Sequence, residues 1–96
     1  MIKANSYFEG QVQSLGFTQQ DGDSSVGVMA AGEYTFGTAA AERMTVVKGA
    51  LTVKKAGEEQ WVTYNSGESF NVEANSSFDL QVAVSTAYLC EYLSAE

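Results

Sequence analysis

The chain of 96 residues has room for one domain with one hydrophobic core, so we expect a single domain over residues 1–96. Twelve acidic residues against five basic ones give a net charge of −7, and the acidic residues are spread along the chain without forming a block. Because proteins bind the phosphodiester backbone mainly through clustered Lys and Arg, this balance argues against nucleic acid as a partner.

Glycines divide the chain into short segments that are typical of β-strands. Nine glycines and no proline occur, and the glycines are closely spaced from Gly10 to Gly67. Between them, β-branched or aromatic residues tend to occupy alternate positions, as at Val26 and Val28 and at Met44 and Val46. In chain order, this pattern predicts strands at 7–13, 25–30, 33–36, 42–47, 50–55, 60–64, 69–73, 77–83 and 87–93.

Turns are predicted where glycine or asparagine can adopt a positive φ at low cost, at 21–23, 48–50, 56–58, 65–67 and 75–77. A helix competes only at 38–44, an alanine-rich stretch, but three β-branched residues follow it at 45–47 and favour a strand. Because a small domain has difficulty in hiding open sheet edges, we expect an all-β fold that is closed or sandwiched.

Residue types that common catalytic and metal sites require are missing. The sequence has no histidine, which removes histidine bases, histidine-activated nucleophiles and histidine metal ligands. Cys90 is the only cysteine, so the usual zinc sites are excluded as well, and we interpret it as a small buried hydrophobe. A single thiol forms no intramolecular disulfide, which suits the cytoplasm, and the hydropathy pattern predicts neither a signal sequence nor a membrane span.

Glu42 is the strongest candidate for a functional side chain. Alternation along the strand predicts that it faces the same side as Met44 and Val46. A carboxyl group on an apolar face has a raised pKa unless donors or cations compensate, and such groups are often functional. The competing interpretation is a strand-end residue turned to water. Arg43 faces away by the same alternation, so it is either a phosphate ligand or a solvated surface charge.

Aromatic side chains are the second group of candidates, because they can stack on a flat ring. The residues considered are Tyr34, Phe36, Tyr64, Phe70, Phe78, Tyr88 and Tyr92, with ordinary core packing as the competing interpretation. The hydroxyl of Thr38 is a candidate donor to a small anion.

Two stretches resemble the motifs of the cupin fold with the metal-binding histidines replaced. In the first, Gly32 is followed after five residues by Thr38, then by Glu42, and after six more residues by Gly49. In the second, Gly67 is followed by Glu73 and Phe78, the latter at the position of a histidine. The resemblance implies a single-domain, RmlC-like jelly-roll β-barrel without a metal ion.

A closer resemblance covers nearly the whole chain. The segments SYFEGQVQSLGF (6–17), VGVMAAGEYTF (26–36), ERMTVVKGAL (42–51), ESFNV (68–72), FDLQVA (78–83) and YLCEYL (88–93) are similar to the pyrimidine/purine nucleoside phosphorylase family. The chain departs from the family at 73–75, where Glu-Ala-Asn replaces an expected PGH-type turn.

That resemblance implies a homodimer that splits purine and pyrimidine nucleosides with inorganic phosphate as co-substrate, giving free base and α-D-ribose 1-phosphate without a metal or other cofactor. The residues are compatible with this chemistry, because phosphorolysis passes through an oxocarbenium-like state that a carboxylate can stabilise. We therefore assign Glu42 and Thr38 as catalytic candidates, and Tyr34, Phe36, Arg43, Met44, Phe78 and Tyr92 as substrate-binding candidates.

Two other functions remain open from the sequence. A metal-free cupin that binds a small molecule, or that acts as an assembly module, has the same fold without turnover. A cupin isomerase or epimerase acting on a sugar is the other, although the lack of histidine disfavours it.

Overall fold

The computed structural model describes residues 2–93, which form an almost entirely β structure. The elements in chain order are β1 (Lys3–Tyr7), the 3-10 turn η1 (Phe8–Gly10), β2 (Val12–Gln19), β3 (Gly22–Met29), β4 (Gly32–Thr38), β5 (Glu42–Lys48), β6 (Ala50–Lys55), β7 (Val62–Asn65), β8 (Ser69–Val72), β9 (Ser76–Val82) and β10 (Thr86–Tyr92). The all-β prediction is confirmed, and the stretch 38–44 forms no helix.

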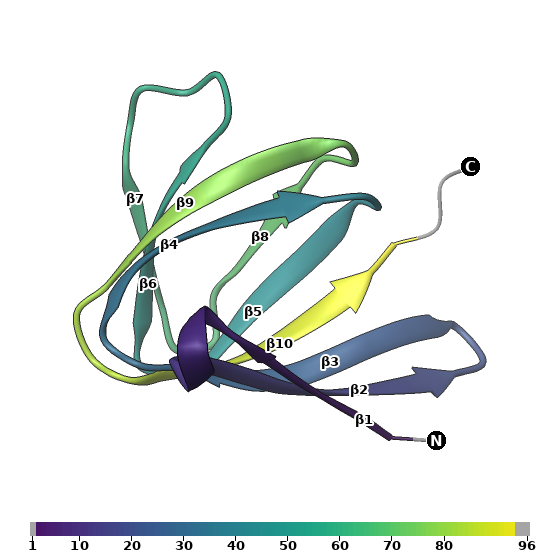
Figure 1. Ribbon diagram of the computed structural model, residues 1–96. Helices are drawn as coiled ribbons and strands as arrows, with labels where there is room; N and C mark the ends of the chain where they lie inside the picture. Colours follow the sequence, from purple (N-terminus) through teal and green to yellow (C-terminus); the bar gives the residue numbers. More distant parts are fainter. Residues whose placement is uncertain (1, 94–96) are drawn as a thin grey trace.

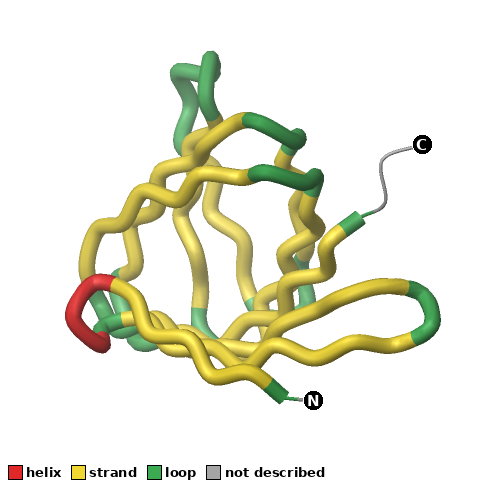
Figure 2. Tube along the Cα trace, turned by 45° about the vertical axis from the view of Figure 1, so that its right-hand side comes forward, coloured by secondary structure: helices red, strands yellow, loops and turns green. Residues whose placement is uncertain are grey.

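The strands form two antiparallel sheets that face each other (Figure 1). Six strands are ordered β1-β2-β3-β10-β5-β8, and four are ordered β4-β9-β6-β7. Figure 2 shows β4 and β9 lying across the larger sheet, while the β2–β3 hairpin projects beyond them. Hydrogen bonding is not continuous around the molecule, so the barrel consists of two packed sheets rather than one closed sheet.

The chain crosses between the two sheets at tight turns. Gly49 is the single residue between β5 and β6, which belong to different sheets. Its φ is positive, at 108°. A β-carbon at this position would also collide with the side chain of Thr86, whose hydroxyl hydrogen-bonds the backbone of Ala50. Glycine is therefore required at Gly49 by both backbone conformation and space.

The N-terminal region differs from the prediction. The single strand expected at 7–13 is interrupted at Phe8 and Glu9, which adopt left-handed conformations with φ of 53° and 57°. Two strands result, and β2 continues through residues 14–19, where no strand was expected. Alternating hydrophobicity is weak in β2, because the inward positions after the buried Val12 are Ser14 and Gly16.

Side-chain alternation places the core between the sheets. On β5, Met44 and Val46 are buried as predicted, and on β6 Leu51 and Val53 are buried as well. On β3 the alternation turns Val26 and Val28 outward, where they are exposed, and Ser25, Gly27 and Met29 point inward. The buried apolar cluster comprises Val12, Met29, Tyr34, Met44, Val46, Leu51, Val53, Phe70, Val72, Phe78, Leu80, Val82, Tyr88 and Cys90.

Over residues 2–93 we find no helix long and apolar enough to cross a membrane.

Candidate active site

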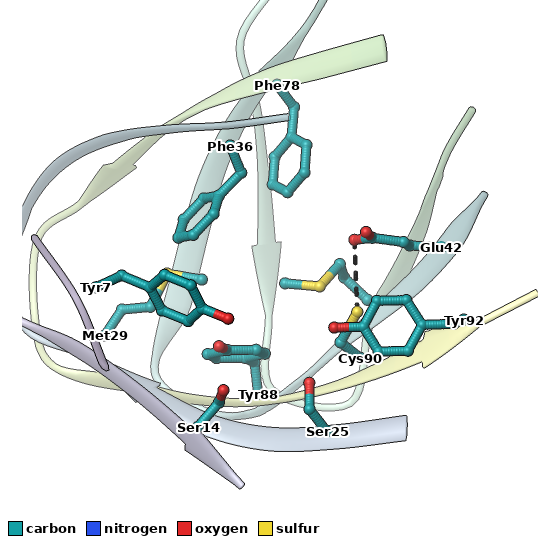
Figure 3. Close-up of a pocket in the computed structure, with 11 residues that line it drawn as sticks. Tyr7, Ser14, Ser25, Met29, Phe36, Glu42, Phe78, Tyr88, Cys90 and Tyr92 are labelled. Atoms are coloured by element: carbon teal, nitrogen blue, oxygen red, sulfur yellow. Dashed lines mark hydrogen bonds between the residues drawn. The ribbon is translucent and has the colours of Figure 1, made fainter. Parts of the chain in front are cut away.

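A cavity of about 100 Å³ lies between the two sheets beside the core (Figure 3). Its lining comes from both sheets and comprises Tyr7, Ser14, Ser25, Met29, Phe36, Glu42, Met44, Phe78, Tyr88, Cys90 and Tyr92. One buried water needs roughly 10–15 Å³ of such space, so the cavity has room for several water molecules. This is enough for a planar ring system, and the cavity is also partly open to solvent.

The cavity has an apolar side and a hydroxyl-rich side. Phe36 on β4 and Phe78 on β9 are cross-strand neighbours, and their rings stack with centroids 5.8 Å apart and planes 25° apart. Figure 3 shows these two rings on one side of the cavity, with the hydroxyls of Ser14, Ser25 and Tyr88 opposite them. A flat ligand can therefore stack on one side while its polar groups meet hydroxyls on the other.

Small residues on the larger sheet create this space. Ser14 pairs with Gly27 across β2 and β3, and Gly16 pairs with Ser25 in the neighbouring row. These positions face inward by the same alternation that turns Val26 and Val28 outward. Because serine and glycine do not fill the distance between two sheets, a hollow remains where apolar side chains would have closed it.

Among residues 2–93, Glu42 is the only carboxyl group that lines the cavity. It lies at the start of β5, is half-buried, and accepts a hydrogen bond of 3.4 Å from the Cys90 thiol to its Oε1 atom. Burial raises the pKa of Glu42, and the hydrogen bond from Cys90 opposes that rise. The pKa of the Cys90 thiol is itself raised, chiefly by burial and next by the nearby carboxyl, so the thiol keeps its proton and acts as a donor.

The phenol groups of Tyr88 and Tyr92 also keep their protons at neutral pH, because the pKa of each is raised. Burial is the main cause that raises the pKa of Tyr88 and of Tyr92 above the ordinary value near 10. Hydrogen bonding with Ser14 opposes the rise at Tyr88, and hydrogen bonding with Ser25 opposes it at Tyr92. The cavity therefore presents neutral hydrogen-bond donors opposite its aromatic side.

The structure brings five of the eight candidate residues together around the cavity: Phe36, Glu42, Met44, Phe78 and Tyr92. The other three have partners elsewhere. Tyr34 donates its hydroxyl to the carbonyl of Ala30 at 2.7 Å. Thr38 donates to the carbonyl of Glu73 and accepts from the amide of Ser76, which fixes the loop before β9. Arg43 lies on the outer face of β5 and pairs with Glu91 at 3.1 Å. These three side chains are not part of the site that the cavity defines.

Six lining residues were not among the eight assigned candidates, although Tyr88 was one of the aromatic residues considered for stacking: Tyr7, Ser14, Ser25, Met29, Tyr88 and Cys90. Ser14 was missed because the strand predicted at 7–13 stops before it, and Ser25 was missed because alternation alone does not show which face of β3 points inward. The sequence feature that could have indicated them is the presence of serine and glycine at alternate positions in 14–16 and 25–27. Among residues 2–93, no three His, Cys, Asp or Glu side chains are grouped so that they could hold a metal ion.

Comparison with solved structures places the fold in a known class. A cupin of the RmlC-like type from Shewanella frigidimarina aligns with a TM-score of 0.76 at 14% identity, covering 100% of this chain and 86% of that one. This distant likeness concerns the fold alone, and it confirms the predicted cupin architecture. A far more similar structure, a Vibrio parahaemolyticus protein described as being of unknown function, has a TM-score of 0.94 at 71% identity and covers 97% of this chain and 99% of that one.

Sequence comparison identifies the family within that class. The family model described as pyrimidine/purine nucleoside phosphorylase matches residues 2–92. A Vibrio cholerae protein named pyrimidine/purine nucleoside phosphorylase is 68% identical over 95 residues, which cover 99% of this chain and all of that protein. The chain therefore belongs to the pyrimidine/purine nucleoside phosphorylase family, as its sequence motifs suggested.

Proposed function

We propose that this protein is a nucleoside phosphorylase of broad specificity, which splits purine and pyrimidine nucleosides with inorganic phosphate into free base and α-D-ribose 1-phosphate. Its family membership supports the reaction class. The structural observation that carries the proposal is a carboxyl group, Glu42, that faces a cavity with an aromatic side and a hydroxyl side. These are the groups needed for a sugar that carries a flat base at one position and hydroxyls at others.

In this mechanism, Glu42 acts on the ribose. A carboxylate only accepts hydrogen bonds, so it matches ribose hydroxyls, which donate. As the bond from the sugar to the base breaks, positive charge develops on the ring, and a nearby carboxylate stabilises it most strongly in a site that excludes water. Cys90 acts as a positioning residue, because its thiol proton holds one carboxylate oxygen.

Broad base tolerance follows from the aromatic side. Phe36 and Phe78 offer ring faces to the base, and Met44 adds an apolar contact. Stacking is favourable for every base, and a surface that reads few polar edges rejects few of them. Tyr92 completes the lining next to Glu42 and Cys90, as shown in Figure 3.

The finer features of the proposal come from the family resemblance and the composition. We propose that phosphate is the only co-substrate and that the reaction uses no metal, which agrees with a chain that has no histidine. A cytoplasmic location is proposed because the single cysteine forms no intramolecular disulfide and because nucleosides and phosphate are both available there.

A homodimer is part of the same proposal. Leu15, Val26 and Val28 lie on the outer face of the six-stranded sheet, each about half exposed, and Leu15 is the cross-strand partner of Val26. A second copy would cover this apolar surface, which bears no charge at these positions. Light scattering on the purified protein is expected to give twice the mass of the chain, and the mass of a monomer would refute this part of the proposal.

The activity is tested by incubating purified protein with adenosine or uridine, with and without inorganic phosphate, and measuring the released base. Release from both nucleosides that depends on phosphate is expected. Glu42→Gln should lower kcat/KM by about a hundredfold or more, because it removes charge stabilisation in the transition state. Glu91→Gln is the matched control, since Glu91 lies on the outer face of the adjacent strand and pairs with Arg43.

Nucleoside binding without release of base would show a binding module instead of an enzyme. Turnover of sugar phosphates without phosphorolysis would favour an isomerase. A folded Glu42→Gln variant with full activity would remove Glu42 from the mechanism.

A further inference from the structure

The hydroxyl side of the cavity contains a group of three residues to which no function has yet been given. Tyr7 ends β1, Ser14 lies on β2, and Tyr88 lies on β10, so three strands contribute one hydroxyl each. In Figure 3 the three hydroxyl oxygens lie toward the same end of the cavity, away from Glu42. We propose that Tyr7, Ser14 and Tyr88 form the subsite for inorganic phosphate, an inference that rests on the proposed function.

The first argument is the match of donors and acceptors. Phosphate oxygens accept hydrogen bonds, and hydroxyl groups can donate them. Glu42 accepts only, so it suits the ribose and repels an anion. The two ends of the cavity are thus complementary to the two different parts of the reaction.

The second argument is separation from the carboxylate. Ser14 and Glu42 lie on β2 and β5, with β3 and β10 between them. Three spacings between neighbouring strands place their backbones about 14 Å apart. The side chains extend from these distant strands into one cavity, so the carboxyl group and a bound phosphate can contact different sides of the same ribose.

The third argument is the stereochemistry of the reaction. Natural nucleosides carry the base on the β face of the sugar, and the proposed product carries phosphate on the α face, so phosphate must attack from the side opposite the base. In the cavity, the Phe36 and Phe78 rings lie opposite the hydroxyls of Ser14 and Tyr88 (Figure 3). A base stacked on the rings leaves the other face of its sugar toward these hydroxyls.

The reaction is balanced in this arrangement. An oxygen of hydrogen phosphate forms a bond to C1′ of the ribose, and the bond from C1′ to the base nitrogen breaks. Its electron pair goes to the base, and the proton of hydrogen phosphate ends on the base, directly or through water. The three hydroxyls hold phosphate in line for this attack and are not consumed.

Two features of the backbone place these hydroxyls. Gly27, in the middle of β3, has an ordinary negative φ, yet a β-carbon there would lie 2.6 Å from the Tyr88 hydroxyl and 2.7 Å from the Gln13 carbonyl. The missing side chain therefore makes room for Tyr88. Tyr7 precedes the two left-handed residues of η1, and Phe8 docks that turn by packing on Tyr34 and Phe36 with centroids 5.0 and 5.4 Å apart. Backbone strain of this kind is commonly retained where it positions a functional group.

The test compares the KM for phosphate with the KM for uridine in variants that lose one hydroxyl. Tyr88→Phe and Ser14→Ala should each raise the KM for phosphate about tenfold or more, as expected for loss of a hydrogen bond to a charged ligand, with little change in the KM for uridine. Tyr64→Phe is the matched control, because Tyr64 stacks on Phe70 outside the cavity. Unchanged KM values for phosphate in both folded variants would overturn the subsite. A rise in the KM for uridine without a rise in the KM for phosphate would overturn it as well.

A binding measurement separates this inference from the proposed function. Calorimetric titration of the wild type with inorganic phosphate should show binding that Tyr88→Phe weakens and Tyr64→Phe retains. Phosphate binding with this pattern but without phosphorolysis would refute the enzyme and support the subsite. Phosphorolysis that is equally sensitive to phosphate in all variants would support the enzyme and refute the subsite.

Discussion

The space between the two sheets is filled at one end and hollow at the other, although both ends follow the same alternation of side chains. At the filled end, the inner faces of β6, β8 and β9 carry Leu51, Phe70 and Leu80, all buried. At the hollow end, the inner faces of β2 and β3 carry Ser14, Ser25 and Gly27. The backbone geometry is alike, so the size and polarity of inward residues decide which part is core and which part is site.

The largest effect on stability is expected at the filled end. Leu51→Ala should lower the free energy of unfolding by about 2–5 kcal/mol, because Leu51 is fully buried and the change leaves a void. Urea denaturation measures the loss. Ser14→Ala is the contrasting variant, and its effect should be about 0.5–1.5 kcal/mol, since it removes one hydrogen bond to Tyr88 and leaves no large void. Equal losses in the two variants would show that the ends are not different.

A second substitution closes part of the hollow end. Gly27→Ala should cost about 1–3 kcal/mol, because the new methyl group must displace the Tyr88 ring or the β2 backbone. It should also raise the KM for phosphate, since the Tyr88 hydroxyl moves. Denaturation and kinetics on the same preparation check both results. A variant as stable as the wild type would contradict the close approach at Gly27.

The carboxyl group of the hollow end should reduce stability where its charge is present. Burial raises the pKa of Glu42 above 4.5 in the folded state, so the folded protein binds this proton more tightly than the unfolded chain does. Stability from this group is full below pH 4.5 and is lost as the pH rises through the raised folded value. Glu42→Gln carries no charge, so it should be more stable than the wild type at pH 7, and this difference should shrink toward pH 4.

Thermal denaturation at the two pH values measures the change, and the same variant should be less active. A difference in stability that is independent of pH would show that Glu42 titrates in the folded protein as it does in water.

The smallest effect is expected outside both ends. Arg43 and Glu91 form an ion pair across β5 and β10 on the outer face, where both side chains are substantially exposed. Exposed pairs contribute about 0–1 kcal/mol, so Arg43→Ala should change stability by no more than that, and phosphorolysis should remain near wild type. A large loss of activity would place Arg43 at the site after all.

Most of the fold was predictable from local patterns, but only part of the site was. Alternation at Glu42, Met44 and Val46 placed a carboxyl group on the inner face, because a regular strand sends every second side chain the same way. Phe36 and Phe78 were recognised as aromatic candidates, yet their stacking depends on the register of β4 against β9, which no local pattern specifies.

The sequence by itself determined the all-β class, the glycine turns, the family and the position of Glu42 on an inner face. Only the tertiary structure decided that β2 exists as a separate strand, that Ser25 and Gly27 rather than Val26 and Val28 occupy the inner face of β3, and that Thr38 is held by backbone partners. Strands with small polar inward residues lack the hydrophobic signal that marks a core face, because their role is to leave space rather than to fill it. That space exists only when a second sheet covers it.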